Sequence, residues 1–504
     1  MEVLSGLADG FAIALQPANL LWCFLGVFLG TIVGVMPGLG PPATIAMLLP
    51  LTFLMSPASA MIMLAGIYYG AKYGGSTTAI LLNVPGESAS VVTCLDGYQM
   101  ARKGRGGAAL GIAAIASFVA GTVGVLGLML VAPPLARLAL AFSSPEYFAL
   151  MMLGLAMVVL LAGRSLVKAL LAMLVGLWLA GIGTDLFTSV SRFTFGQLEL
   201  LSGLDFVVVA IGVFALGEVL ANLENSGAAQ SLPVPKGLRN LLPTLADLRR
   251  CRFAFLNGSL VGFFVGVLPG AGSTIASFVS YGIEKAFSRR REELGTGVPE
   301  GVAAPEGANN AETGGALVPL LTLGIPGSAT TAILLAALVL WGFRPGPLFL
   351  SDNPSLFWGL VASMYLGNLM LLLLNLPLVP LFAQVLRAPA HVLYPVIVGM
   401  SIVGVYSAST SLFDVGLLAG FGLLGYLMRK LDYPSAPLIL GLVLGGAMER
   451  ALRQSLMMSG GSLSILVSRP IAAAMLSLAL LILAIPLFAR LNAWRLQAME
   501  EEGK

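Results

Sequence analysis

The sequence predicts an all-α polytopic membrane protein, and two observations lead to this fold class. Of its 504 residues, 58% are hydrophobic and only 10% are charged, whereas soluble proteins carry about 25% charged residues. Spanning a bilayer takes about 20 apolar residues per helix, and residues 10–71 contain no charged side chain. By this length criterion we expect about 12 transmembrane elements, some of them broken or re-entrant because Gly and Pro interrupt them.

The order of apolar segments and loops follows from the charges. Further uncharged runs cover residues 107–132, 253–283, 316–343, 355–386 and 470–489, and shorter or sparsely charged stretches lie near 145–163, 166–184, 205–222, 389–412, 415–428 and 435–448. Four basic clusters separate them: Arg102, Lys103 and Arg105; Lys236, Arg239, Arg249, Arg250 and Arg252; Arg289, Arg290 and Arg291; and Arg429 with Lys430. The positive-inside rule assigns these clusters to the cytoplasm. Residues 223–252 then form a cytoplasmic linker between a first half, residues 1–222, and a second half, residues 253–504.

Composition also excludes several classes of function. A formal net charge of +3 is too small to indicate nucleic-acid binding. The one histidine, His391, argues against a histidine-rich metal site or a Ser–His hydrolase, and no pair of apposed intramembrane Asp residues is evident. The three cysteines have no metal or redox spacing, and the chain has no phosphate-binding GxxxxGK[ST] motif. We therefore expect no enzyme and no bound cofactor.

Two pairs of matching motifs indicate an internal repeat. VGVMPGLG at 33–40 matches VGVLPGAG at 265–272, and VPGES at 84–88 resembles IPGS at 325–328. Each member of the second pair follows two adjacent glycines, at 74–75 and at 314–315. The first copy follows a segment without Lys or Arg and the second follows the basic linker, so the positive-inside rule predicts opposite orientations. We expect two inverted-topology repeats with a binding site at their interface, although a direct repeat stays open.

Pro-Gly motifs inside apolar helices suit ion and anion binding. Proline removes a backbone donor and glycine permits positive φ, so the helix breaks. The free N–H groups suit a carboxylate, and the free carbonyls and nearby hydroxyls suit a cation. The candidate substrate- or ion-binding residues are Pro37, Gly38, Gly40 and Thr44; Ser76, Thr77, Thr78, Asn83, Pro85 and Gly86; Pro269, Gly270, Gly272, Ser273 and Thr274; and Asn310, Pro326, Gly327, Ser328 and Thr330. For Gly26, Gly30, Gly258 and Gly262 we favour helix packing instead.

Three charged residues near these motifs have two interpretations each. Lys72 either pairs with a substrate carboxylate or extends to the membrane interface. Glu87 and Glu312 are either proton or cation sites or exposed loop residues. Asp96 lies in a polar loop with Arg102, where we expect an interfacial ion pair.

The longest motifs resemble those of a known transporter family. They are VGVMPGLGPPATIA at 33–46, YGAKYGGSTTAILLNVPGESASVVTCLDGYQMARKGRGGAALG at 69–111, VGVLPGAGSTIASF at 265–278 and PEGVAAPEGANNAETGGALVPLLTLGIPGSATTAILLAAL at 299–338. With these segments the chain resembles the large membrane subunit, TctA, of the tripartite tricarboxylate transporters, over nearly its whole length.

The resemblance implies partners and an energy source. Members of that family work with a small membrane subunit of about four helices, TctB, and a periplasmic solute-binding protein, TctC, that captures a carboxylate. Uptake across the bacterial inner membrane is secondary and is coupled to an ion gradient, commonly Na⁺, with H⁺ as the other choice. The prediction is a permease subunit that imports a di- or tricarboxylate by cation symport; a stand-alone carrier or a channel without partner subunits is the alternative.

Overall fold

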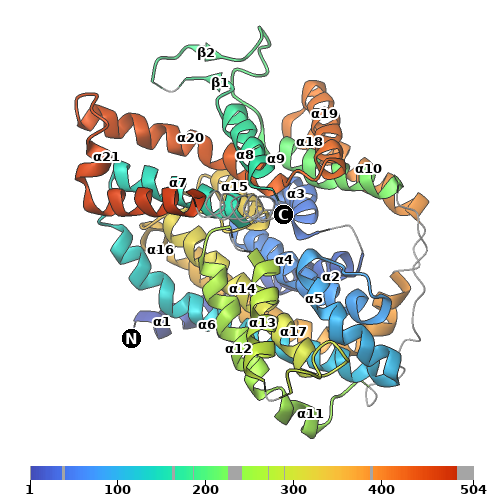
Figure 1. The fold of residues 1–504 in the computed structure, drawn as a ribbon. Helices are drawn as coiled ribbons and strands as arrows, with labels where there is room; N and C mark the ends of the chain where they lie inside the picture. Colours follow the sequence, from blue (N-terminus) through green and yellow to red (C-terminus); the bar gives the residue numbers. More distant parts are fainter. Residues whose placement is uncertain are drawn as a thin grey trace, which may run out of the picture. The chain divides into compact units, whose positions relative to one another are not determined.

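A computed structural model describes residues 2–36, 40–161, 165–185, 187–224, 241–270, 272–288, 290–385 and 390–484. Regular structure in these ranges is helical apart from one pair of two-residue strands, β1 (Gly183–Thr184) and β2 (Ser191–Arg192) (Figure 1). Six of the described helices are long and apolar enough to cross a membrane, and shorter apolar helices accompany them. The prediction of an all-α membrane protein is confirmed, whereas the number of about twelve crossings stays a prediction.

Contacts divide the chain into two compact units. Unit 1 comprises Met1–Leu140 and Asp205–Lys430, and unit 2 comprises Ala141–Leu204 and Leu431–Lys504. All the repeated motifs fall in unit 1. The division into halves around residues 223–252 stays a prediction, and residues 225–240 of that linker lie outside the described residues.

The first part of unit 1 is built on a close helix pair. Its elements are α1 (Glu2–Ala14), α2 (Pro17–Val35), α3 (Pro41–Leu48), η1 (Leu49–Leu54) and α4 (Pro57–Leu82). A Cβ atom placed on Gly26 or Gly30 of α2 would lie 2.4 or 2.6 Å from a backbone carbonyl of α4. The backbones therefore touch, as small residues at spacing four allow. Gly26 meets Met63 and Gly30 meets Ile67, so residue numbers increase in the same direction along both helices. Helices α2 and α4 therefore run parallel.

A string of short elements leads from α4 to the long helix α6. They are η2 (Ser88–Ser90), α5 (Val91–Thr93), η3 (Cys94–Tyr98) and η4 (Ala101–Arg105), followed by α6 (Gly106–Ala139). Unit 1 resumes with α9 (Phe206–Ala210), η5 (Ile211–Leu216), α10 (Gly217–Glu224) and α11 (Leu245–Arg250). It ends with α15 (Ala329–Leu340), α16 (Phe349–Asp352), α17 (Pro354–Val385), α18 (Ala390–Ser409) and α19 (Leu412–Lys430), after the three helices described next.

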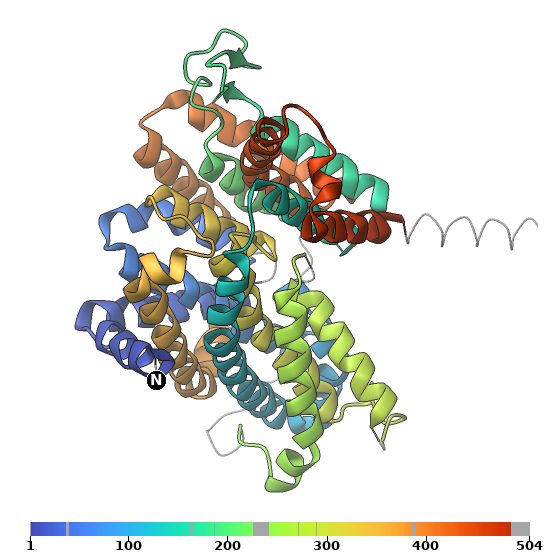
Figure 2. The ribbon, with the colours of Figure 1, turned by 90° about the vertical axis from the view of Figure 1, so that its left-hand side faces the viewer.

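Helices α12 (Arg252–Val267), α13 (Gly272–Phe287) and α14 (Glu300–Leu323) repeat the close packing. Cβ atoms on Gly258 and Gly262 would lie 2.7 and 2.4 Å from carbonyls of α14, and the contacts again run parallel. The packing interpretation of these glycines is confirmed. Helices α12 and α13 form an antiparallel hairpin. The Asn257 amide, in the first half of α12, donates to the carbonyl of Ser280, in the second half of α13, at 2.8 Å. Figure 2 shows α12 and α13 side by side.

Helices α4 and α14 run antiparallel where the two copies of the repeat meet. Tyr68 of α4 bonds to Glu312 of α14, and Ser76, two turns further along α4, bonds to Glu306, earlier in α14. Both helices end in a left-handed residue, Asn83 with φ 57° and Gly324 with φ 71°. Helix α3 packs against α15, and α13 packs against η2. The same contacts thus recur in the two copies; their opposite orientation across a membrane stays a prediction.

The loops with basic residues meet at one end of unit 1. Arg105 Nη2 lies 2.8 Å from Asp247 of α11, and Lys103 donates to the carbonyl of Thr296. Arg250 pairs with Glu300 at 2.8 Å. Three of the four basic clusters, or the loops that contain them, therefore gather as a shared cytoplasmic assignment requires.

Asp96 corrects one expectation in this region. Its carboxylate accepts hydrogen bonds from the Tyr281 hydroxyl at 2.9 Å and from the backbone N–H groups of Gly295, Gly297 and Val298. The expected pair with Arg102 is wrong, because the carboxylate is fully buried against the loop before α14.

Unit 2 packs α7 (Ser144–Leu161), α8 (Leu166–Ala180), α20 (Ser435–Met458) and α21 (Ile465–Ser468) against one another, and the short hairpin of β1 and β2 follows α8. Asp185, beside β1, pairs with Arg453 of α20 at 2.9 Å. The backbone N–H groups of Thr188 and Phe187 hold the pKa of Asp185 well below its usual range. This ion pair ties the hairpin to α20.

Candidate functional site

Lys72, on α4, stands at the centre of a buried group of charges. Its side chain is 3% exposed, and its ammonium lies 3.6 Å from Glu87 and 3.8 Å from Glu312. The same Nζ donates to the hydroxyl of Ser273 at 2.5 Å. Lys72 therefore lies inside the protein beside two carboxylates and does not extend to the membrane interface. We call Lys72, Glu87, Glu306 and Glu312 the buried charge cluster.

Helix breaks supply two sides of this cluster. Glu87 follows the break after α4, and its other carboxylate oxygen accepts from the Asn309 amide of α14 at 2.7 Å. Ser273 stands at the start of α13, directly after the PGAG break. The breaks bring these side chains to α4 because Gly86 can approach the carbonyl of Gly34, where a Cβ would lie only 2.0 Å away.

Glu306 is the fourth charged member and has a different environment. It is fully buried on α14 and accepts hydrogen bonds from the hydroxyls of Ser76 on α4 and Thr93 on α5. The described residues place no ammonium or guanidinium group in ion-pair contact with it. A carboxylate held only by hydroxyls in an apolar interior is a strong candidate for binding a proton or a cation.

Other predicted residues serve the breaks themselves. Gly270, with φ 86°, donates its N–H to the carbonyl of Gly327 at 2.8 Å. The break before α13 therefore contacts the break before α15. Pro269 and Pro326 lie in the same two turns, and Gly272 begins α13 with φ 62°. Ser328 caps α15 by accepting from the N–H of Thr331. Thr274 donates to Ser88 at 2.9 Å, which joins α13 to η2.

Several predicted residues make no hydrogen bond to the charged groups of the cluster in the described part of the chain. Pro37 and Gly38 lie outside the described residues, so the first break is described only from Gly40, the N-cap of α3. Thr44 and Thr78 donate to carbonyls of their own helices, and Asn83 ends α4 in the left-handed conformation. Asn310 donates to Ser117 of α6, and Thr330 is buried in the first turn of α15. Pro85 precedes Gly86 in the break after α4.

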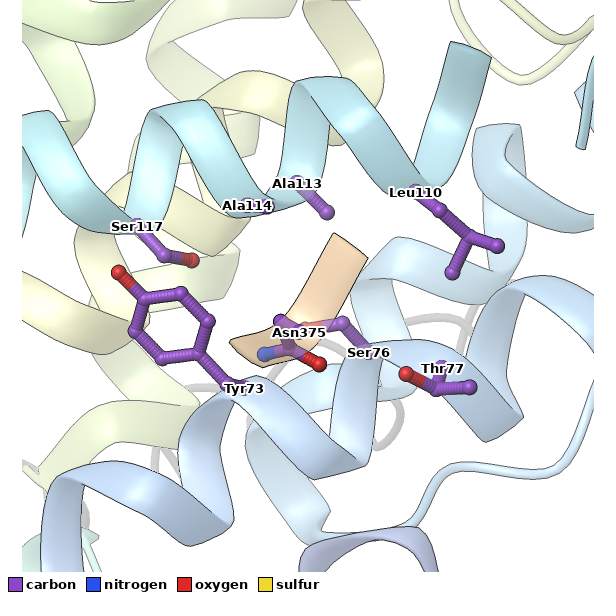
Figure 3. Close-up of a pocket in the computed structure, with 8 residues that line it drawn as sticks. All are labelled: Tyr73, Ser76, Thr77, Leu110, Ala113, Ala114, Ser117 and Asn375. Carbon is purple, nitrogen blue, oxygen red and sulfur yellow. The ribbon is translucent and has the colours of Figure 1, made fainter. Parts of the chain in front are cut away.

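A small cavity lies between α4, α6 and α17 next to Ser76. It has room for roughly one water molecule. Figure 3 shows its lining, which is Tyr73, Ser76 and Thr77 of α4, Leu110, Ala113, Ala114 and Ser117 of α6, and Asn375 of α17. Hydroxyl and amide groups thus line the cavity together with the apolar side chains of Leu110, Ala113 and Ala114.

Sequence reasoning missed Glu306, Tyr68 and Thr93 as members of the site. Tyr68 donates to Glu312 at 2.9 Å, and its ring lies under the Lys72 ammonium at 5.3 Å. The sequence offers only a weak signal, because Glu306 stands six residues before Glu312 in a segment with no Lys or Arg, and only the structure shows that this segment is buried throughout. Its meaning depended on knowing that α14 has no exposed face.

Comparison with known proteins places this arrangement in a family. The model described as the tripartite tricarboxylate transporter TctA family matches residues 20–440. The chain belongs to this family. It is therefore a multi-pass membrane component of a transporter, as the resemblance of its motifs implied.

Curated relatives of this TctA-family chain come from Agrobacterium vitis. One is described as an uncharacterized 52.8 kDa protein in the TAR-I ttuC′ 3′ region and is 48% identical over 502 residues, covering all of both chains. A second, from the TAR-II ttuC′ 3′ region, is 42% identical over 241 residues, which is 48% of this chain and all of that protein. No solved structure matches the chain.

Proposed function

We propose that this chain is the large permease subunit of a binding-protein-dependent secondary transporter that imports a di- or tricarboxylate with Na⁺ or H⁺ across the bacterial inner membrane. The observation that carries the proposal is the buried charge cluster at the meeting of antiparallel α4 and α14. Transporters with inverted repeats bind substrate and coupling ions at such an interface, beside broken helices. The antiparallel course of α4 and α14 and the recurring contacts support that topology.

The mechanism follows from the charges and helix ends at the cluster. A periplasmic binding protein docks and hands over the carboxylate, and a small four-helix subunit completes the membrane complex. The N-termini of α13 and α15, at Ser273 and Ser328, offer partial positive charge to the anion. The cation binds hydroxyl and carboxylate oxygens of the buried charge cluster and of the side chains beside it. Occupancy by both solutes then permits the inward movement.

Uptake into vesicles that contain all three components tests this function. A panel of carboxylates is offered under separate Na⁺ and pH gradients, with the potential clamped. We expect accumulation of at least one di- or tricarboxylate that depends on one of the two gradients. Uptake that needs neither gradient would contradict symport, and full uptake by the large chain alone would contradict dependence on partners.

A further inference from the structure

The charges of the buried cluster do not balance. Lys72, Glu87, Glu306 and Glu312 are between 0% and 6% exposed, and they comprise one ammonium and three carboxylates. Lys72 contacts only Glu87 and Glu312 of the three. Unpaired ionised carboxylates are too costly to hold in an apolar interior, so such a group binds a proton or a cation. Of the three carboxylates, Glu306 is the one without an ion-pair partner among the described residues.

We propose that Glu306, with the hydroxyls of Ser76 and Thr93, is the site that takes up the coupling charge, either Na⁺ or a proton. This inference rests on the proposed symport and assigns its cation to three side chains. Of these three side chains only Ser76 was among the residues predicted from the sequence, and the Pro and Gly residues of the breaks are not ligands in this assignment. The cation-loaded state is then the one in which the cluster can accept an anionic substrate.

The hydroxyl geometry suits either occupant. Ser76 Oγ lies 3.3 Å from the carbonyl of Lys72 as well as beside Glu306, so its proton has a second acceptor. When the hydroxyl donates to that carbonyl, its lone pairs are free for Na⁺, which favours oxygen ligands. If Glu306 instead takes a proton, it can donate to one of the hydroxyls.

Glu306 also connects the cation to a helix break. Thr93 belongs to α5, which continues from the Pro85–Gly86 break, and Ser76 belongs to α4 before that break. Glu87, within the same break, reaches α14 through Asn309, whose Oδ1 is buried without a hydrogen-bond partner in the described chain. A cation at Glu306 therefore joins α4, α5 and α14 at one point, and its loss loosens the break from α14.

A pH response of Glu306 must be separated from that of its neighbours. The titratable or charged groups on elements packed near it are Tyr68, Tyr69, Lys72 and Tyr73 of α4, Glu87 before η2, Cys94, Asp96 and Tyr98 of η3, Tyr281, Glu284 and Lys285 of α13, and Glu300 and Glu312 of α14. Helices α6 and α12 contribute only Arg137 and Arg252, which stand at helix ends far along the sequence from the contacts with Glu306.

Thermal unfolding of the purified full-length chain tests the assignment without any substrate. One arm titrates NaCl against choline chloride at constant ionic strength, and the other varies pH between 5 and 9 without Na⁺. A Na⁺ site predicts saturable stabilisation by NaCl; a proton site predicts stabilisation toward low pH with no Na⁺ effect. A wild-type protein that responds to neither variable overturns the proposal.

Variants then identify the residue. Glu306→Gln should abolish the response that the wild type shows. For a Na⁺ site, Thr93→Val or Ser76→Ala should raise the Na⁺ concentration for half-saturation by about tenfold, because each removes an oxygen ligand. For a proton site, the same variants should move the midpoint of the pH response to higher pH, because each removes a hydrogen bond that favours the ionised carboxylate. Glu293→Gln makes the same chemical change at an exposed loop residue and should behave as wild type. If Glu306→Gln does not fold, the two hydroxyl variants decide. An unchanged response in Glu306→Gln, or in both hydroxyl variants, overturns the proposal.

This test fails separately from that of the proposed function. Cation stabilisation that depends on Glu306, in a protein that takes up no carboxylate, would retire the symport proposal and keep the cation site. Gradient-driven uptake with a normal cation response in Glu306→Gln would retire the site and keep symport.

Discussion

Lys72 shows how one residue organises the site. Its ammonium is held by Glu87 and Glu312 while its Nζ donates to Ser273, so it links α4, the break after α4, α14 and α13. Buried ion pairs contribute little net stability, but removing one partner leaves an uncompensated charge. The residue therefore matters more for specifying the arrangement than for stabilising the fold.

Lys72→Met should destabilise the protein by about 3–5 kcal/mol, because two buried carboxylates lose their counter-ion. Lys72→Met/Glu312→Gln restores the original net charge and should recover much of this loss. The free energy of unfolding in detergent, measured for the single and double variants, checks both expectations. Additive losses in the double variant would show that Lys72 and Glu312 do not interact.

The buried carboxylate of Asp96 leads to a second prediction for a single residue, which concerns stability alone. Asp96→Asn leaves one acceptor oxygen where two now serve three N–H groups and Tyr281, so we expect a loss of about 2–4 kcal/mol. Tyr281→Phe removes a single donor and should cost about 1 kcal/mol. Hydrogen exchange of residues 293–300 should accelerate in Asp96→Asn; unchanged exchange there would contradict this role.

At the scale of elements, the glycine contacts set how closely the helices pack. Gly34 on α2 and Gly266 on α12 face the carbonyls of Ala71 and Glu312, where a Cβ would lie 2.1 and 2.5 Å away. Ala71 directly precedes Lys72, and Glu312 is itself a member of the buried charge cluster. Close packing of these helix pairs therefore determines where Lys72 and Glu312 lie.

Gly34→Ala and Gly266→Ala should each force the paired backbones apart and reduce both folded yield and uptake. Gly282→Ala on α13 is the matched control, because a Cβ there meets nothing within 4 Å. Alanine should be neutral or stabilising by up to about 1 kcal/mol at that helical position. Thermal melting points of the three variants provide the test, and equal behaviour at all three positions would contradict the packing argument.

The repeat could be predicted from sequence because Pro-Gly breaks are rare inside apolar helices. Its register could not be fixed at every position. The sequence pairs Gly74-Gly75 with Gly314-Gly315, but the contacts match Gly74 to Gly315, since a Cβ on either would lie 2.2 Å from a carbonyl, of Thr31 or of Phe263, at matching positions of α2 and α12. Gly314 instead faces Gly124 of α6. Runs of small residues leave such a one-residue ambiguity.

At the scale of the whole molecule, hydropathy predicted a helical membrane protein and left the interior assignments open. Glu306 was missed because sequence spacing cannot tell a buried helix face from an exposed one when charges are sparse. Lys72, Glu87 and Glu312 were singled out, yet their meeting depends on α4 and α14 crossing antiparallel, which no local pattern encodes. The breaks were predicted from Pro-Gly chemistry, whereas their partners across the repeat required the tertiary contacts.

The gathering of basic loops predicts the orientation of the molecule. Lys103 and Arg249 are exposed at the shared basic end of unit 1. In a background without the native cysteines, Lys103→Cys and Arg249→Cys should react with a membrane-impermeant maleimide only from the cytoplasmic side. Labelling of both from the periplasm would reverse the assignment, and labelling from opposite sides would contradict the grouping of the loops.

The most direct test of the central claim is carboxylate uptake by the Lys72→Met/Glu312→Gln protein in vesicles with both partner components. This variant keeps the net charge of the cluster but removes the ion pair that joins α4 to α14. We expect normal insertion and a loss of gradient-driven uptake of at least about a hundredfold, because productive geometry is lost at the binding site. Uptake at the wild-type rate would contradict the claim that the buried charge cluster is where anion and cation meet.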